Sequence, residues 1–120
     1  MINKISTKFK HILDSRFKNI EIACINPKYA YEYAMFNNLK KFELGEAIIA
    51  TDSKYSYFYA YNILDGPFKL GEPAIATNAY KSYMYSILVL KRRFHLGERI
   101  ISKSDFFKKK YDWFYNGFSG

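Results

Sequence analysis

Few side chains in this sequence could do chemistry, and they are isolated from one another. The chain contains one cysteine, Cys24, and two histidines, His11 and His95. A catalytic nucleophile needs a base within hydrogen-bond reach, and a structural zinc site needs about four Cys or His ligands. These residues suggest no Ser-His-Asp or Cys-His arrangement, and the six glycines form no phosphate-binding loop. The sequence therefore predicts that the protein is not an enzyme and has no metal site and no cofactor.

Three glutamates recur at a fixed spacing and are the best candidates for an acidic array. Glu46, Glu72 and Glu98 each end the motif Phe-x-Leu-Gly-Glu, and each lies 26 residues from the next. No Asp, Glu or His recurs beside all three, as a metal or acid–base site would require. A carboxylate in the first turn of a helix stabilises the positive end of the helix dipole. We expect the glutamates to have this structural role or to cap free N–H groups there.

The same 26-residue period runs through most of the chain, so the sequence is an internal repeat. Two rows of tyrosines follow this period. The first row is Tyr31, Tyr57 and Tyr83, and the second row is Tyr33, Tyr59, Tyr85 and Tyr111. A further row consists of residues that cap helix N-termini, namely Asn26, Asp52, Asn78 and Ser104. The capping row predicts that a helix begins directly after each of its four positions.

Each repeat is predicted to fold as two helices. Apolar and small residues in the second copy recur at helical spacing, which predicts a long helix over residues 53–64, with equivalents at 27–40 and 79–91. The run Asp65-Gly66-Pro67 ends this helix, because Gly66 takes a left-handed cap and Pro67 cannot continue a helix. A short helix over residues 71–77 follows. Alternating tyrosines would suit a strand, but the caps and the small residues favour helices.

The predicted fold class is all-α. A two-helix unit of this size cannot bury its apolar face alone, so neighbouring units must stack. We expect a small α-solenoid of 26-residue two-helix repeats with degenerate end caps, or a compact right-angled stack of the same units. The single domain comprises a degenerate leading unit at 1–25, full repeats at 26–51, 52–77 and 78–103, and a closing helix at 104–120.

The repeat has the pattern Tyr-x-Tyr-Ala, then Phe-x-x-Gly-Glu, then Ile-Ala. In the second copy the pattern is carried by Tyr57, Tyr59, Ala60, Phe68, Gly71, Glu72, Ile75 and Ala76. It resembles a short tandem α-helical repeat of uncharacterised bacteriophage and giant-virus proteins, and the resemblance covers about residues 17–111. The resemblance implies a viral origin and a helical fold, and no catalytic activity is assigned to that group.

The two tyrosine rows are predicted to face opposite ways, because residues two apart in a helix point about 200° apart. The second row keeps a tyrosine in the closing helix, Tyr111, so we expect that row to be buried. The first row is replaced there by Lys109, which indicates a position open to water. We therefore predict that Tyr31, Tyr57 and Tyr83 are exposed and contact a partner.

Basic residues gather at one phase of the repeat, where the long helix ends. The formal net charge of the chain is +8. Lys40, Lys41, Lys91, Arg92 and Arg93 share this phase, and Lys69 lies close by in the following loop. These six residues are the candidate partner-binding cations. Such a ridge attracts phosphate backbones or an acidic protein surface. Cations at helix C-termini are also favourable without a ligand, and residues 65–67 interrupt the row.

These features favour a non-enzymatic interaction module that binds and inhibits a host protein. A nucleic-acid-handling defence enzyme, alone or in complex with nucleic acid, is the expected partner, by analogy with anti-CRISPR proteins. Sequence-nonspecific nucleic-acid binding and a self-associating structural protein are the alternatives, and the oligomeric state stays open.

The cytoplasm, that of the host cell for a viral protein, is the expected location. A lone cysteine forms no intramolecular disulfide, and the sequence contains neither a signal peptide nor an apolar run of membrane-spanning length. No membrane partner is expected.

Overall fold

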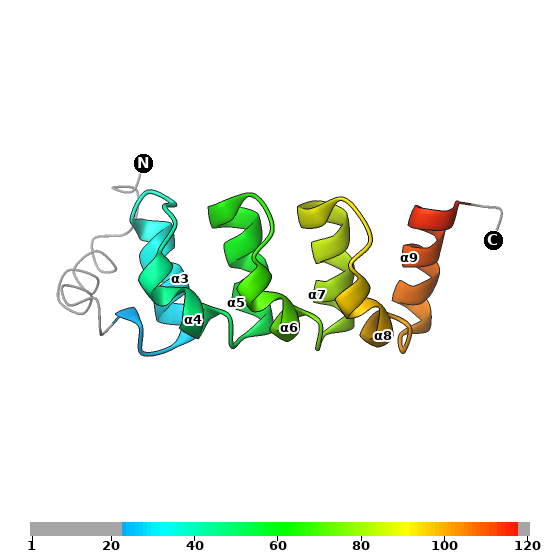
Figure 1. Cartoon of the computed structure of the whole chain (residues 1–120), viewed down its shortest axis with the longest axis horizontal. Coiled ribbons are helices and arrows are strands. Elements are labelled where there is room, and N and C mark those ends of the chain that lie inside the picture. Colours follow the sequence, from blue (N-terminus) through cyan, green and yellow to red (C-terminus); the bar gives the residue numbers. More distant parts are fainter. Residues whose placement is uncertain (1–22, 118–120) are drawn as a thin grey trace.

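The computed structural model describes residues 23–117, which form helices and turns without a strand. The prediction of an all-helical protein is confirmed for this part of the chain. The leading unit predicted at 1–25 falls almost entirely on residues 1–22, which lie outside the described residues. Long helices stand side by side in a row, and a short helix follows each of the first three (Figure 1).

Three helical hairpins and a final helix make up the described chain. The first hairpin contains α3 (Pro27–Phe36) and α4 (Glu43–Ile49). In the second, α5 (Ser53–Phe58) continues as a π-helix (Tyr59–Leu64), and a 3-10 turn (Lys69–Gly71) leads into α6 (Glu72–Ile75). The third repeats this plan with α7 (Ala79–Met84), a π-helix (Tyr85–Leu90), a 3-10 turn (His95–Gly97) and α8 (Glu98–Ile101). The final helix is α9 (Asp105–Asn116).

The four predicted N-caps are confirmed. Each side-chain oxygen accepts a hydrogen bond from the backbone N–H three residues later. The distances are 2.8 Å at Asn26, Asp52 and Asn78 and 3.3 Å at Ser104. The cap residue itself has extended backbone, so the chain turns sharply into each long helix. These caps fix where every long helix begins.

The ends of the long helices depart from the prediction. The second and third long helices close with i→i−5 bonds, for example from the Lys91 N–H to the Ser86 carbonyl at 2.7 Å. The left-handed residue after them is Asp65 (φ 51°) or Lys91 (φ 57°). The prediction that Gly66 takes this conformation is therefore wrong, because the wider π-turn ends one residue earlier.

Small residues bring the two helices of each hairpin into close contact. A Cβ atom on Gly71 would lie 2.5 Å from the Ser56 Oγ and 2.6 Å from the Phe68 ring. Gly97 meets Ser82 and Phe94 in the same way. The Ser56 hydroxyl is fully buried and donates to the Ile49 carbonyl at 3.0 Å. The glycine of the repeated motif thus makes room for the small residue of the long helix.

The second tyrosine row joins each long helix to the loop of the hairpin before it. The Tyr59 hydroxyl accepts from the Phe42 N–H at 2.8 Å and donates to the Glu46 carboxylate at 2.7 Å. Tyr85 and Tyr111 make the same two bonds 26 and 52 residues later. The prediction that this row is buried is confirmed for Tyr59, Tyr85 and Tyr111, each at most 3% exposed, whereas Tyr33 is partly buried.

Candidate functional site

The first tyrosine row lies between neighbouring long helices rather than on the outside. Tyr31 is 8% exposed and Tyr57 is 7% exposed, so the prediction that they face solvent is wrong. The Tyr31 ring packs 5.6 Å from Tyr55 and 5.9 Å from Phe58, both in the following long helix. Tyr83 is partly buried, with its ring 5.5 Å from Phe107 of α9.

The position of α9 explains this error. Tyr31 packs against α5 and Tyr83 packs against α9, in each case the long helix that comes next. No long helix follows α9 within the described residues, so Lys109, which takes the tyrosine's place there, is exposed. The exposure of Lys109 in the described chain therefore does not show whether the equivalent inner positions are exposed to water. Burial also raises the pKa of the Tyr31 and Tyr57 hydroxyls.

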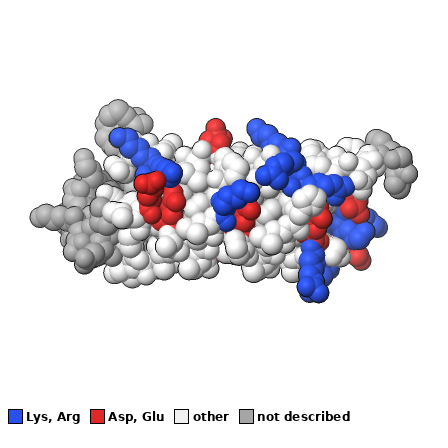
Figure 2. Space-filling model, viewed as in Figure 1, with Lys and Arg blue, Asp and Glu red and all other residues white. Residues whose placement is uncertain are grey.

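Five of the six predicted cations are exposed in the loops that follow the long helices. They are Lys40 and Lys41 in the first hairpin, Lys69 in the second, and Lys91 and Arg92 in the third. We call these five residues the basic edge. Figure 2 shows Lys and Arg side chains over successive hairpins on one face of the molecule, with acidic side chains beside them. Lys41 pairs with Glu43 at 3.2 Å in a largely exposed ion pair.

Arg93 differs from the other five cations because it is partly buried and bound within the protein. Its guanidinium lies over the rings of Tyr111 and Tyr115, with distances of 5.6 and 5.3 Å to the ring centres. It also lies 3.4 Å from a Glu98 carboxylate oxygen and donates to the Asn116 side chain. Arg93 therefore joins the third hairpin to α9, and its inclusion among the exposed cations is corrected.

The three glutamates hold tyrosine hydroxyls, which sequence reasoning missed. Each lies in the first turn of its helical segment, as predicted, and its carboxylate accepts a hydrogen bond from a tyrosine hydroxyl. The hydroxyl of Tyr111 lowers the pKa of Glu98, and His95 and Arg93 lower it further. Burial and the bonds to the carboxylates raise the pKa values of Tyr59, Tyr85 and Tyr111. The constant spacing of 13 residues between each Glu and its Tyr was the available signal.

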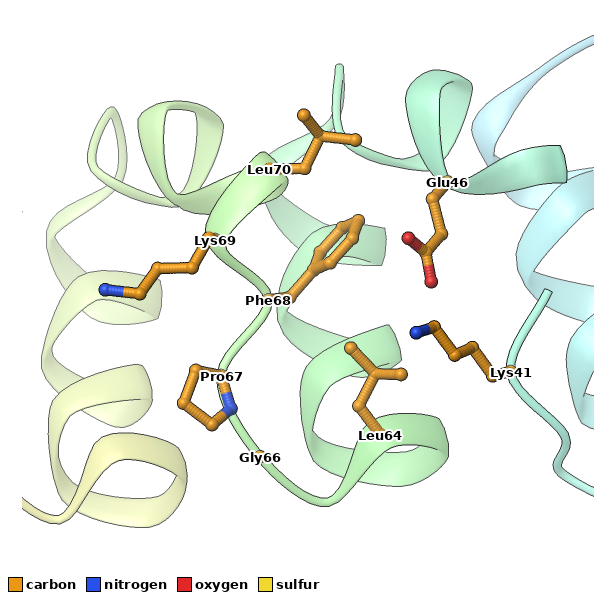
Figure 3. Close-up of a pocket in the computed structure, with 8 residues that line it drawn as sticks. All are labelled: Lys41, Glu46, Leu64, Gly66, Pro67, Phe68, Lys69 and Leu70. Carbon is orange, nitrogen blue, oxygen red and sulfur yellow. The ribbon is translucent and has the colours of Figure 1, made fainter. Parts of the chain in front are cut away.

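A hollow of about 390 Å³ lies between the loops of the first and second hairpins (Figure 3). Its apolar wall contains Leu64, Phe68 and Leu70, and its cations are Lys41 and Lys69. Lys41 points toward the carboxylate of Glu46, whereas Lys69 points away (Figure 3). Two members of the basic edge thus lie next to exposed apolar surface.

A second hollow of about 370 Å³ lies against α9. It is lined by Tyr83, Lys109, Lys110, Trp113 and Phe114. Trp113 is 51% exposed and Phe114 is 49% exposed. Aromatic surface and positive charge therefore occur together at this end of the described chain. The lysines at residues 108–110 are a basic cluster in the sequence, but their position beside the exposed Trp113 and Phe114 was not predicted.

The remaining reactive groups have structural surroundings. Cys24 is partly buried, its thiol donates to the Leu44 carbonyl at 3.5 Å, and burial raises its pKa. His95 is exposed and lies 3.3 Å from Glu98. In residues 23–117, no three His, Cys, Asp or Glu side chains are grouped so that they could hold a metal ion.

Comparison with protein-family models, curated proteins and solved structures finds no match to this chain. Between residues 23 and 117, no helix has the length and apolar character needed to cross a membrane.

Proposed function

We propose that the protein is a small α-solenoid of 26-residue two-helix repeats that acts as a non-enzymatic interaction module of viral origin. Its basic edge binds an acidic surface of a host protein, such as an enzyme that handles nucleic acid. The recurrence of the cap, glycine and tyrosine–glutamate contacts at one period supports the repeat architecture. The viral origin rests on the resemblance of the repeat to bacteriophage and giant-virus proteins.

The observation that carries the binding proposal is the exposure of the same kind of side chain in three successive loops. Lys40, Lys69 and Arg92 are exposed, one in each loop. The three side chains lie outside the described core, and Arg92 makes an exposed 3.4 Å hydrogen bond to the Arg93 carbonyl. Repeated cations along one edge attract an acidic surface and accelerate encounter with it.

Charge reversal tests the proposal against a matched control. The edge variant carries Lys40→Glu, Lys69→Glu and Arg92→Glu, one change in each loop. The control variant carries Lys28→Glu, Lys54→Glu and Lys103→Glu, three exposed lysines near the starts of the long helices. Both variants change the net charge equally, so only the location of the charge differs. Each immobilised protein is incubated with nuclease-treated host lysate, and the captured proteins are identified by mass spectrometry.

We expect the edge variant to lose an acidic protein that the wild type and the control variant both retain. Equal capture of host proteins by the wild type and both variants would show that the basic edge is not part of the binding surface. Capture that depends on omitting the nuclease would show that the edge binds nucleic acid.

The hollow against α9 favours a second candidate function, the binding of single-stranded nucleic acid. Bases stack on exposed aromatic rings such as Trp113 and Phe114, while Lys109 and Lys110 attract phosphates. A gel-shift series at about 50 mM salt and upward tests it, because this binding weakens steeply with salt. We expect Lys109→Glu/Lys110→Glu to abolish the shift, and an unchanged shift would contradict this site.

A further inference from the structure

One position of the repeat is leucine in all three hairpins and is exposed in all three. Leu44, Leu70 and Leu96 are 70%, 56% and 56% exposed, respectively. They belong neither to the described core nor to the partly buried residues that pack against it. Single exposed leucines are common on proteins, but these three occupy equivalent positions. Their recurrence therefore indicates a surface feature of the repeat, which we call the leucine row.

The backbone that leads into each leucine is similar in the three hairpins, although Leu44 lies in an α-helix whereas Leu70 and Leu96 lie in 3-10 turns. Two residues earlier, a phenylalanine is buried, and the next residue is a buried glycine. The phenylalanine backbone has φ of −123°, −121° and −109° in the three hairpins. Leu70 points away from its own hairpin (Figure 3). The short helices α4, α6 and α8 that carry or follow the leucines lie in a row (Figure 1).

The basic edge runs beside the leucine row. Lys69 precedes Leu70 directly, and Lys41 lies three residues before Leu44. Lys41, Lys69 and Leu70 also line the same hollow between the first two hairpins. Two glutamates lie in this stretch of the first hairpin. Glu43 pairs with Lys41 at 3.2 Å, and Glu46 lines the hollow and accepts a hydrogen bond from the Tyr59 hydroxyl. In the next two hairpins Lys69 and Arg92 are exposed beside the leucine row, and positive charge beside an apolar row suits an apolar stripe flanked by carboxylates.

We propose that the leucine row and the basic edge together bind an amphipathic, acidic α-helix of the partner protein. This inference rests on the proposed function and names the element that the basic edge recognises. Packed helices lie about 8–10 Å apart, whereas seven residues of an α-helix rise about 10.5 Å. An apolar residue at every seventh position of the partner therefore presents about one side chain to each hairpin. Carboxylates beside that stripe meet Lys40, Lys69 and Arg92.

Fluorescence anisotropy with designed peptides tests this proposal on the full chain. The probe is a labelled helical peptide of about three heptads, with leucine along one stripe and glutamate beside it. A scrambled peptide of the same composition spreads the leucines around the helix. The row variant carries Leu44→Ser, Leu70→Ser and Leu96→Ser. The matched control carries Leu39→Ser and Leu88→Ser, two exposed leucines elsewhere, and circular dichroism confirms that each variant is folded.

We expect the striped peptide to bind the wild type and the control variant. Binding to the row variant should be weaker by about tenfold or more, because leucine burial contributes to it. Equal binding of the striped and scrambled peptides, or equal binding by the row variant, would overturn the inference. Absence of binding up to ~1 mM peptide would do the same.

The edge variant separates this inference from the proposed function. If the edge variant binds neither the striped nor the scrambled peptide while the row variant binds both, the basic edge is part of the binding surface and the leucine row is not. That result would overturn the inference and leave the proposed function intact. Self-association that the row variant abolishes, without peptide binding, would assign the row to a second copy of the chain and overturn the inference. Oligonucleotides that compete with the striped peptide and bind the row variant more weakly would also overturn it.

Discussion

At the scale of single residues, the glycine before each repeated glutamate controls how closely the two helices of a hairpin approach. In the second hairpin a Cβ on Gly71 would lie 2.5 Å from the Ser56 Oγ, closer than atoms of this kind can pack. Gly66, five residues earlier, has only the Leu64 carbonyl oxygen nearby, at 3.8 Å. There is therefore no room for a side chain at Gly71, whereas there is room for a methyl group at Gly66.

Gly71→Ala should lower the free energy of unfolding by about 1–3 kcal/mol, because Ser56 and Phe68 must move to admit the methyl group. Gly66→Ala should change the free energy of unfolding by less than about 0.5 kcal/mol. Urea denaturation followed by circular dichroism measures both values. Equal effects of the two substitutions would show that close packing at Gly71 does not limit stability.

The residue scale also shows why the tyrosine rows were hard to predict. Sequence spacing correctly separated Tyr57 from Tyr59, because residues two apart leave a helix on different sides. It could not show that the side holding Tyr57 is buried, or that α5 covers the equivalent Tyr31. The prediction was based on Lys109, which is exposed because no helix follows α9 in the described chain. Its exposure therefore does not represent the environment of the inner positions.

At the scale of elements, the long helices are joined to the preceding loops through tyrosine hydroxyls. Tyr59, Tyr85 and Tyr111 each donate to a carboxylate and accept from a backbone N–H. The bond to the carboxylate needs the hydroxyl proton, because a phenolate beside a glutamate is repelled, whereas the bond from the backbone N–H does not need it. Burial and the adjacent carboxylate raise the pKa values of all three hydroxyls, and the N–H bond opposes that rise.

We expect the protein to unfold more easily as the pH rises above about 10. In the unfolded chain these tyrosines lose their protons near pH 10, whereas in the folded chain their pKa values are higher. Their contribution is therefore complete below about pH 10 and is lost as the pH rises further. Each tyrosine should lower the free energy of unfolding by about 1.4 kcal/mol per pH unit in that range.

Urea unfolding at a series of alkaline pH values measures this slope. The variant Tyr85→Phe provides the comparison, because it removes one titrating group from the buried set. Its free energy of unfolding should fall less steeply with pH than that of the wild type, by about 1.4 kcal/mol per pH unit, the contribution of one tyrosine. A stability that stays constant between about pH 10 and pH 11 would contradict the prediction.

Helix boundaries divide into those that sequence could predict and those that it could not. Asn26, Asp52, Asn78 and Ser104 predicted every long-helix start, because capping depends on one local side chain. The π-helical ends at residues 59–64 and 85–90 were missed. A shift from i→i−4 to i→i−5 bonds changes the backbone without changing the apolar pattern over so few residues.

At the scale of the whole molecule, α9 completes the third hairpin. Tyr111 binds the Phe94 N–H and Glu98, and Arg93 packs over Tyr111 and Tyr115. Lys108 and Asp112 of α9 occupy positions that hold small residues in the preceding long helices. The two side chains form an ion pair at 3.0 Å. The all-helical architecture followed from the repeat, but the role of Arg93 depended on contacts with residues more than 15 positions away.

Removing residues 105–120 should lower the free energy of unfolding by roughly 3 kcal/mol or more, because the Phe94 N–H loses its partner and Glu98 and Arg93 each lose one of theirs. The exposed pair Lys108–Asp112 is the control, and its double alanine variant should cost less than about 1 kcal/mol. Thermal and urea unfolding measure both. A truncated chain as stable as the intact one would contradict this role of α9.

The backward direction of the tyrosine bonds has a consequence for biosynthesis. The Phe42, Phe68 and Phe94 amides are each held by a hydroxyl 17 residues further along the chain. On a ribosome, the phenylalanine N–H of each loop can form this hydrogen bond only after the following long helix has emerged. Each loop therefore becomes ordered only after the next hairpin has begun to emerge. Protease sensitivity of stalled nascent chains would follow that order, with the loop at residues 91–94 protected last.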